Sequence, residues 1–435
     1  MEKKRYAIVG LGGRGIGMFA KPLVTEYADV AELVGFCDIN PMRMEVGNRR
    51  IGKEVSCYTD FDKMLDETNP DTVIVTSKDC THDKYIVRAL ERGRDVITEK
   101  PMTINDEKCR AILEAEKKSG KTLKVTFNYR FAPYSTKIKE LVKSGILGDI
   151  YSVEFHWYLD TIHGADYYRR WHGKKENSGG LLVHKSTHHF DLVNWFIEEE
   201  PEKVFALGSR RFYGNNREAG NARCLGCAKK DTCEFYWDIA ANKGTKELYL
   251  DAEKADGYIR DGCVFSPDIN IEDTMSVLVK YDKGAQLSYT LSSHMPFEGW
   301  DMAINGSKGR LECGVAETYY ERDARKLSER TSIRKSIDRR KAAEGDQSSV
   351  TTDTIRFYPM FGGVEVFNVD RVKGGHGGGD ERLKDMLFRG GIPDPLDHLA
   401  GSWQGAMSIM IGVSANRSIA TGLPVNLKEL LKGDA

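Results

Sequence analysis

The sequence contains no uninterrupted apolar run close to the roughly 18 to 20 residues that a membrane-spanning helix requires. It has no excess of either charge, because 64 lysines and arginines stand against 65 aspartates and glutamates, a formal net charge of -1. Nothing therefore indicates an electrostatic affinity for nucleic acid or for an anionic membrane. Internal repeats and long low-complexity segments are also absent. A small, neutral partner fits this composition better.

We expect neither a secretory signal nor a disulfide framework from this sequence. Its first residues, MEKKRYAIVGLGGRGIG, lead directly into a strand-like segment that is too short and too glycine-rich for a signal core. Nine cysteines is an odd number. Five of them are scattered along the chain: Cys37, Cys57, Cys80, Cys109 and Cys313. Such cysteines suit a reducing compartment, so we expect a cytoplasmic protein.

The first third of the chain contains a strand that runs into a glycine-rich turn. In RYAIVGLGGRGIG the apolar strand stops at Gly10, and a helix begins near Arg14. The glycines follow the pattern G-x-G-x-x-G, in which missing side chains allow a tight turn and let a pyrophosphate approach backbone N–H groups. We expect five residues here to bind a dinucleotide: Gly10, Gly12, Gly13, Arg14 and Gly15.

Asp38 ends the second strand-like segment, AELVGFCD. An acidic residue at about this distance after the glycine-rich turn meets the 2'-hydroxyl of a ribose. Its carboxylate would repel a 2'-phosphate, so NAD is expected rather than NADP. The alternative is a glycine-rich turn in some other α/β domain, with Asp38 capping a loop before Pro41.

Strands and helices alternate over the rest of residues 1–127. The strand-like segments are TVIVTS, DVITEKP and TLKVTFNYR, and the helical ones are HDKYIVRALERG and NDEKCRAILEAEKKSG. This order predicts a doubly wound parallel sheet, followed by a second domain over residues 128–435. Ligands of such sheets bind beyond the carboxyl ends of the strands. Further cofactor-binding residues are therefore expected at Thr76, Glu99, Lys100 and Asn128.

The run GGLLVHKSTHHFDLVNWF concentrates titratable groups. His184, His188 and Asp191 recur at spacings of four and three, so they share one face if the run is helical. A histidine can accept the proton that a hydroxyl loses when hydride leaves its carbon, and a cationic Lys100 would stabilise the resulting alkoxide. The spacing also suits zinc, with Asp191 as a third ligand, and the histidines could instead be packed in the core. Acid/base chemistry is favoured because Lys185 replaces the glutamate of the hydrolytic H-E-x-x-H motif.

Four stretches, in this order, resemble the glucose-fructose oxidoreductase and inositol dehydrogenase (Gfo/Idh/MocA) family: VGLGGRG, VITEKPMT, VTFNYRF and SGGLLVHKSTHHFDLVNWF. EGWDMAINGSKGRLE and GGHGGGD extend the resemblance towards the C-terminus. The resemblance implies an N-terminal Rossmann domain and a C-terminal α/β domain, whose open, largely antiparallel sheet often mediates oligomerisation. It also implies an NAD-dependent oxidoreductase of sugars, glycosides or inositols, acting as a homodimer or homotetramer.

The same resemblance implies roles for individual residues. Lys100 would lie beside the nicotinamide and the substrate hydroxyl, and His188 would be the catalytic histidine, followed by Asp191. Where polyol dehydrogenases of the family commonly have aspartate, this sequence has His184. This replacement removes a negative charge that would favour protonated His188, so the pair is expected to have a lower pKa or to relay a proton.

Substrate contacts are expected from two further segments. DIYSVEFHWYLDTIHGADYYRRWH becomes a loop crowded with aromatic rings and arginines, which suits a pyranose ring, although core or interface packing is the alternative. The glycine-rich VKGGHGGGDERL lets the backbone approach a ligand closely, and it resembles a loop near the substrate pocket in part of the family. The expected substrate-binding residues are Arg130, Tyr158, His163, Arg170, Trp171, Lys185 and His376.

Four cysteines form a pattern of their own. Cys224, Cys227 and Cys233 are a C-x-x-C followed by a third cysteine, and Cys263 comes later. Four thiolates could hold a structural zinc that braces this segment. Free buried thiols are the main alternative, with an iron-sulfur cluster or disulfides as lesser ones.

Two other segments have clear patterns. SVLVKYDKGAQLSYTLSS has two alternating apolar strands joined at Asp282-Lys283-Gly284, which predicts a hairpin. The segment at about 321–350 is dense in charges of both signs and is expected to be a solvated insertion, with a basic binding patch as the lesser alternative.

Three functions are consistent with these features. The first is an NAD-dependent dehydrogenase of a ring hydroxyl. The second is a redox-neutral glycoside hydrolase, since some relatives keep NAD bound, oxidise a ring carbon, eliminate the aglycone, add water and return the hydride; His184, Lys185 and His376 would serve such steps. The third is a non-catalytic NAD-binding sensor. We favour the first and rank the sensor last, because Lys100, His188 and Asp191 are all present.

Overall fold

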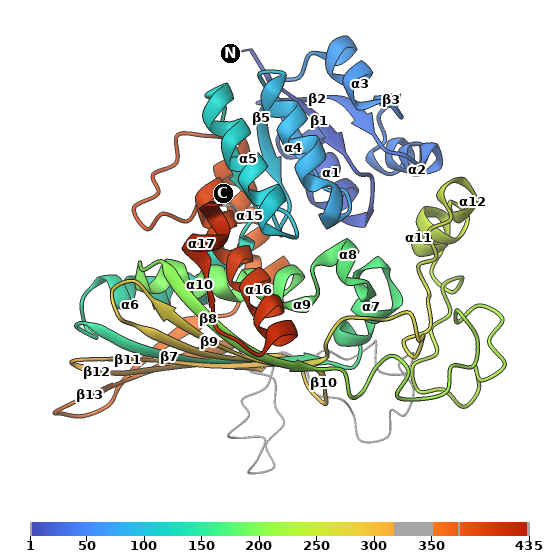
Figure 1. The fold of residues 1–435 in the computed structure, drawn as a ribbon. Coiled ribbons are helices and arrows are strands. Elements are labelled where there is room, and N and C mark those ends of the chain that lie inside the picture. The colour runs from blue at the N-terminus through green and yellow to red at the C-terminus, as the bar shows by residue number, and fades with distance from the viewer. Residues whose placement is uncertain (1, 317–350, 373–374, 433–435) are drawn as a thin grey trace.

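The computed structural model describes residues 2–316, 351–372 and 375–432, which form two sheets with helices between them (Figure 1). The predicted charged insertion at 321–350 lies outside these residues. The first sheet has the order β15-β6-β5-β4-β1-β2-β3. Its strands are β1 (Lys4–Val9), β2 (Ala31–Cys37), β3 (Ser56–Tyr58), β4 (Thr72–Val75), β5 (Asp95–Thr98), β6 (Leu123–Val125) and β15 (Ala400–Gly401).

The first six strands are parallel, as predicted for a Rossmann domain. β1 lies between β2 and β4, so the chain changes direction across the sheet beside β1, where doubly wound sheets bind ligands. The helices of this part are η1 (Gly15–Ala20), α1 (Lys21–Val24), α2 (Pro41–Ile51), α3 (Phe61–Thr68), η2 (Asp79–Thr81), α4 (His82–Glu91) and α5 (Asp106–Ser119).

Local sequence explains where the longer of these helices begin and end. The Asn40 side chain accepts a hydrogen bond from the Met42 N–H at the start of α2, with Pro41 in the first turn, and the helix ends at Gly52. Helix α5 is capped in the same way by the side chain of Asn105 and ends at Gly120.

The strand expected from TLKVTFNYR is shorter than predicted. β6 ends at Val125, and Asn128–Phe131 forms a short 3-10 helix, η3. The N–H of Asn128 bonds to the carbonyl of Thr126, so the chain turns there instead of extending the ladder. This turn places the Asn128 side chain at the carboxyl edge of the sheet. A second departure is β15, which pairs antiparallel with β6 from the far end of the chain.

The second sheet contains nine strands in the described residues, in the order β14-β13-β12-β11-β7-β10-β9-β8-β16. All neighbours are antiparallel except β7 and β10, which confirms the largely antiparallel sheet. The predicted hairpin is β9 and β10. The strands are β7 (Ile150–Asp160), β8 (Pro201–Ser209), β9 (Thr274–Tyr281), β10 (Gln286–Met295), β11 (Gly299–Gly306), β12 (Gly309–Ala316), β13 (Thr352–Pro359), β14 (Glu365–Asp370) and β16 (Val425–Asn426).

Helices α10 and α16 of the second part lie between the two sheets and cover one face of the larger sheet, whereas α11 and α12 lie to one side, near α2 (Figure 1). Burial alternates along β9, so its other face is open in this chain. The helices are α6 (Pro133–Lys143), α7 (His163–Arg169), η4 (Trp171–Gly173), α8 (Lys175–Ser178), α9 (Leu181–His184), α10 (Ser186–Ile197), α11 (Lys243–Thr245), η5 (Lys246–Leu250), α12 (Glu253–Asp256), η6 (Gly375–Gly378), α15 (Gly379–Phe388), α16 (Ser402–Thr421) and α17 (Leu427–Lys432).

Helix α16 packs against both sheets and against α9. Gly412 allows this approach, because a Cβ atom there would lie 2.2 Å from the carbonyl oxygen of Leu182 in α9. The position of α9, and of the His184 that ends it, therefore depends on a long helix from the end of the chain. In the part of the chain that the structure describes, no helix is long and apolar enough to cross a membrane.

Candidate functional site

A cavity of about 950 Å³ begins at the glycine-rich turn and extends between the two domains to His188. Its walls come from the loops that follow β1, β2, β4, β5 and β6, and from α9, α10 and segments of the second domain. Fourteen residues predicted from the sequence line it: Gly10, Gly12, Gly13, Arg14, Asp38, Thr76, Glu99, Lys100, Asn128, Arg170, Trp171, His184, His188 and His376.

The glycine-rich turn has the shape that a dinucleotide requires. Gly10 has φ +93°, and a Cβ there would lie 2.6 Å from the backbone of Ser77; a Cβ on Gly15 would lie 2.4 Å from the Gly10 carbonyl oxygen. These two glycines hold the turn against the sheet. At Gly12 and Gly13, by contrast, an added Cβ would meet only the hydroxyl of Tyr249 within 4 Å. The space beside these backbone amides fits a pyrophosphate.

Asp38 follows β2 at the rim of the same cavity. Its carboxylate accepts hydrogen bonds from the N–H of Leu11 (2.6 Å) and the N–H of Asn40 (2.8 Å). The guanidinium of Arg43 lies 3.9 Å from Asp38 and 2.7 Å from Asp256. The side chain is thus fixed where a ribose of a dinucleotide in this cleft would lie.

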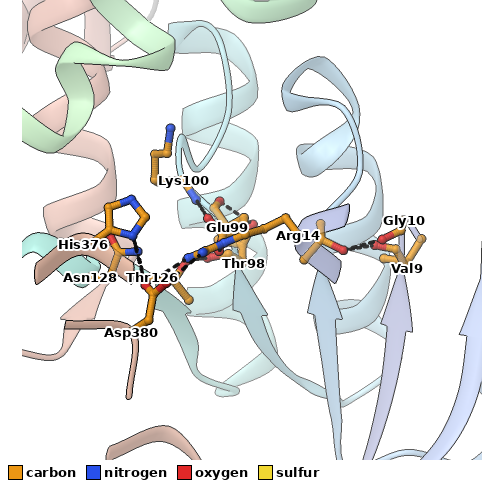
Figure 2. A network of polar contacts seen from close by, with 11 residues as sticks. Val9, Gly10, Arg14, Thr98, Glu99, Lys100, Thr126, Asn128, His376 and Asp380 are labelled. Carbon is orange, nitrogen blue, oxygen red and sulfur yellow. Dashed lines mark hydrogen bonds and ion pairs between the residues drawn. The ribbon is translucent and has the colours of Figure 1, made fainter. Parts of the chain in front are cut away.

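Arg14 connects the glycine-rich turn to two other parts of the chain (Figure 2). Its Nε donates to Glu99 Oε1 at 2.7 Å, and its Nη1 donates to Asp380 Oδ2 at 3.1 Å. Burial alone would raise the pKa of Asp380, but His376 and Arg14 outweigh it and hold that pKa well below its usual range. Asp380 therefore remains a carboxylate and attaches α15 to the cofactor domain.

His376 lies at the end of this network, beyond the carboxyl ends of the parallel strands (Figure 2). Asn128 Nδ2 donates to Asp380 Oδ1 at 2.6 Å and lies 2.8 Å from His376 Nδ1, which is itself 3.1 Å from Asp380 Oδ1. His376 has φ +51°, a conformation that side chains rarely adopt. The surrounding contacts hold it there, and such strain gathers at functional sites.

Lys100 follows β5, and its amine points away from Glu99 into the cavity (Figure 2). The Nζ atom donates to the carbonyl oxygen of His184 at 3.1 Å. Burial lowers the pKa of Lys100 to about 8, against an opposing effect of Asp79. A lysine with this pKa can both hold and release a proton close to neutral pH.

His188 lies on α10, deep in the cavity. Its ring packs edge to face on Tyr129, with centroids 4.8 Å apart. Burial, and secondly the nearby Lys100, lower the pKa of His188 well below its usual range, so the imidazole is neutral. Among the described residues its Nδ1 atom has no hydrogen-bond partner.

His184 is separated from His188 by a break in the helix at Lys185. Its Nδ1 atom lies 2.5 Å from Oδ2 of Asp79, which follows β4. Asp79 thus places a carboxyl group beside His184, while the pKa of His188 is lowered, in the direction expected from the sequence. Burial lowers the pKa of His184 and raises that of Asp79. The contact leaves Nε2 of His184 as the ring nitrogen available to a ligand.

Asp191 and Arg130 are not brought to the cavity wall. They form a bidentate ion pair, with Nε–Oδ2 and Nη2–Oδ1 distances of 2.7 and 2.6 Å, and their side chains are 1% and 3% exposed. Asp191 thus holds Arg130, and both brace η3 against α10.

Three other predicted substrate residues also lie outside the residues that line the cavity. Lys185 is buried over the rings of Tyr129 and Trp157. Both ring nitrogens of His163 are engaged, one with Glu298 and one with Tyr167, each at 2.9 Å. The ring of Tyr158 packs on Phe297.

The four clustered cysteines line a separate cavity, together with Arg169 and Arg223. All nine cysteines are free thiols. In the described residues, however, no group of three or more histidine, cysteine, aspartate or glutamate side chains is arranged to hold a metal ion. The structure therefore does not support the predicted zinc at Cys224, Cys227, Cys233 and Cys263, and the same holds for the zinc alternative at His184 and His188.

Sequence reasoning missed several residues in and around the cavity. Asp79 follows a buried strand, the same signal that singled out Lys100 after β5, and could have been found on that basis. Asp380 and Tyr249 meet the glycine-rich turn from far along the chain, and no local pattern marks them.

Comparison with known proteins agrees with this architecture. Residues 4–127 match the family model described as an oxidoreductase family, NAD-binding Rossmann fold, and residues 139–427 match the corresponding C-terminal alpha/beta domain. The chain is 38% identical to YteT of Bacillus subtilis (strain 168), named as an oxidoreductase with provisional status, over 99% of both chains. It is 29% identical to a myo-inositol 2-dehydrogenase of Thermotoga maritima, over 47% of this chain and 58% of that protein.

Solved structures share the fold at low sequence identity. An aldose-aldose oxidoreductase from Caulobacter crescentus, complexed with glycerol, has a TM-score of 0.62 at 17% identity, covering 98% of this chain and 100% of that one. The WlbA dehydrogenase from Bordetella pertussis, in complex with NADH and UDP-GlcNAcA, has a TM-score of 0.62 at 18% identity, covering 98% and 99%. The chain belongs to the Gfo/Idh/MocA oxidoreductase family, with an NAD-binding Rossmann domain followed by a C-terminal α/β domain.

Proposed function

We propose that this chain is an NAD-dependent oxidoreductase that oxidises or reduces a ring hydroxyl or keto group of a sugar, glycoside or inositol. The observation that carries the proposal is Lys100, whose amine shares one cavity with the glycine-rich turn and has a pKa of about 8. Bound NAD would supply the hydride acceptor. The chain itself must orient the hydroxyl, exclude water and move its proton.

Lys100 is the residue to which we assign the hydroxyl proton. Its neutral amine accepts that proton during oxidation, and its ammonium form returns it during reduction. His188, held neutral, orients the hydroxyl through a hydrogen bond. This reverses the roles expected from the sequence, where His188 was the base, because burial makes the imidazole a weak base and the lysine a usable one.

The substrate class is supported by the remaining wall of the cavity and by the names of relatives. Trp171 offers an aromatic face, and Arg170 offers hydrogen-bond donors, which together suit a polyol ring. A myo-inositol dehydrogenase and an aldose-aldose oxidoreductase are among the similar proteins.

NAD is preferred over NADP in this proposal because two carboxylates, Asp38 and Asp256, flank Arg43 at the ribose end of the cavity. The positive charge of Arg43 offsets only one of the two carboxylates. The three side chains together therefore keep one negative charge, which disfavours a 2'-phosphate. The WlbA dehydrogenase structure contains NADH, which is consistent with a preference for NAD.

The test is to mix purified protein with NAD and a panel of nitrophenyl glycosides and inositols, recording nicotinamide absorbance and nitrophenol release together. We expect NADH to rise with at least one compound of the panel, and Lys100→Met to abolish the rise. Lys117→Met, at an exposed lysine of α5, is the matched control and should leave it unchanged. No NADH with any compound, from protein that binds NAD, would refute the proposal.

A redox-neutral glycoside hydrolase is the second candidate. It is favoured by the Asp79–His184 contact and by His376, which add acid/base groups beyond Lys100 and His188 in the same cavity. Elimination and water addition would need such groups in addition to those that serve hydride transfer. Nitrophenol release without net NADH in the same experiment would select this candidate.

The proposal extends to compartment and assembly. We place the protein in the cytoplasm, since all nine cysteines are unpaired. We also propose a homo-oligomer formed through the open face of the larger sheet, where Leu207 and Leu278 on adjacent strands are 65% and 56% exposed. Sedimentation velocity of wild type and of a Leu207→Glu/Leu278→Glu variant tests this, with a monomeric wild type refuting it.

A further inference from the structure

Residues 243–258 of the second domain cross over to the cofactor domain, where α11 and α12 lie beside α2 (Figure 1). This crossing segment, as we name residues 243–258, is firmly attached. Asn40 Nδ2 donates to the carbonyl oxygen of Ala252 at 2.8 Å, and Arg43 pairs with Asp256 at 2.7 Å. Leu248 is 2% exposed and belongs to the core cluster of the cofactor domain.

The attachment brings one polar group to the glycine-rich turn. The backbone N–H of Gly13 donates to the hydroxyl of Tyr249 at 3.0 Å. The same hydroxyl is the only described atom within 4 Å of a Cβ placed on Gly12 or on Gly13. The amide of this turn is the donor that a pyrophosphate oxygen would use, so the Tyr249 oxygen lies where an oxygen of the ligand is expected.

The surroundings of Tyr249 suit an anion. Arg170 lines the same cavity, and its Nε lies 3.5 Å from the hydroxyl of Tyr258, whose ring packs edge to face on Tyr249. The guanidinium of Arg260 lies 5.7 Å from the centre of the Tyr249 ring. Asp166 pairs with both arginines, so these three side chains together carry one net positive charge beside Tyr249.

We propose that Tyr249 is a cofactor-binding residue contributed by the second domain. With a dinucleotide bound, the Gly13 N–H would donate to a pyrophosphate oxygen instead, and the Tyr249 hydroxyl, released from that bond, would donate to the pyrophosphate as well. The second domain then holds the cofactor directly, which slows its release. The inference rests on the proposed function only in that the ligand is a dinucleotide; it does not depend on the substrate.

The test measures binding rather than turnover. Full-length protein, freed of nucleotide, is loaded with NADH or with ADP-ribose, which has the pyrophosphate but no nicotinamide. Affinity is measured by calorimetry, and NADH release by stopped-flow fluorescence. The variants are Tyr249→Phe, which removes only the hydroxyl, and Tyr236→Phe, at a tyrosine shortly before the crossing segment that does not line the cofactor cavity.

Tyr249→Phe should weaken both ligands about tenfold, mainly through faster release, because a hydrogen bond to a charged group is lost. Tyr236→Phe should match wild type. Unchanged affinity in Tyr249→Phe would overturn the proposal. Tighter binding would overturn it too, because Tyr249 would then merely compete with the pyrophosphate for Gly13. Failure of the oxidoreductase proposal would appear separately, as intact NADH binding without turnover.

Discussion

The Nδ1 atom of His184 lies 2.5 Å from Oδ2 of Asp79, although 105 positions separate the two residues. Asp79 begins η2, just beyond the carboxyl end of β4, and His184 ends α9 in the second domain. The contact therefore joins both domains in the wall of the cavity. It also places a carboxylate near Lys100, where it acts on the charge of the amine.

Asp79→Asn should shift the pH dependence of oxidation to lower pH. The Asp79 carboxylate raises the pKa of Lys100, whereas Lys185 lowers it, so the two neighbours act with opposite sign. Removing the carboxylate favours the neutral amine at lower pH. We expect the midpoint of the kcat profile to fall below 8 in Asp79→Asn and to rise above 8 in Lys185→Met.

The two variants control each other in this experiment. A merely structural defect would lower kcat in both without moving the midpoints in opposite directions. Equal midpoints in wild type and both variants would show that Lys100 does not titrate in the profile. NADH affinity, measured in parallel, should change less than twofold if the effect lies in the proton transfer (~0.4 kcal/mol or less).

Lys100→Arg should strongly lower kcat for oxidation at every pH while leaving NADH binding intact. Arginine keeps the positive charge but does not release its proton, since its pKa exceeds 12. The loss of a general acid/base group costs about 10²- to 10⁴-fold in kcat. In wild type, oxidation should rise and reduction should fall as the pH passes about 8, because the neutral amine predominates above that value. Activity of Lys100→Arg close to wild type would assign the proton to another group.

Asp191→Ala should primarily destabilise the protein. The carboxylate is fully buried against Arg130, and removing one partner of such a pair leaves an uncompensated charge, at a cost of about 3–5 kcal/mol. The free energy of unfolding from urea denaturation is the measurement. Arg130→Met/Asp191→Leu should recover most of the loss, because both charges are then gone. Wild-type stability in Asp191→Ala, with kcat alone reduced, would restore the direct catalytic role implied by the family resemblance.

Gly412→Ala should lower both stability and kcat. The added methyl would meet the carbonyl oxygen of Leu182, so α9 must shift, and His184 shifts with it. Overpacking of this kind costs about 1–3 kcal/mol. Gly17→Ala is the matched control, because a Cβ at Gly17 meets nothing within 4 Å. Thermal denaturation and kcat are compared for the two variants. Equal melting temperatures and equal kcat values would show that α16 moves to accommodate the methyl group and that α9 keeps its position.

The fold was largely predictable because its signals are local. The glycine-rich turn, Asp38 and the alternating strands follow one another in the sequence at fixed distances, and each reflects backbone geometry. The β9–β10 hairpin was equally evident from its alternation and its turn. β6 was predicted too long because the strand-like sequence continues past Val125. The side chain of Asn128, where the chain turns, is held by a hydrogen bond to Asp380 of α15, a contact that the local sequence does not show.

The candidate site was predictable only in part. Residues on the ends of parallel strands, such as Lys100, could be found because strand ends meet at one edge of a sheet. Arg130 and Asp191 carry the polarity of a binding site, but each satisfies the other, which no sequence pattern reveals. Tyr249 reaches the cavity, and Asp380 reaches the Arg14 side chain, through the tertiary fold alone.

The pairing of β15 with β6 has a consequence for biosynthesis. The edge of the cofactor-domain sheet is completed by Ala400 and Gly401, which pair with Val125 and Lys124. The strands β1 to β6 are synthesised long before these residues. Contacts between residues so far apart in the sequence also form slowly. An unpaired edge strand invites pairing with other chains. The nascent cofactor domain therefore has to persist with this edge uncovered until residues 400 and 401 have been synthesised.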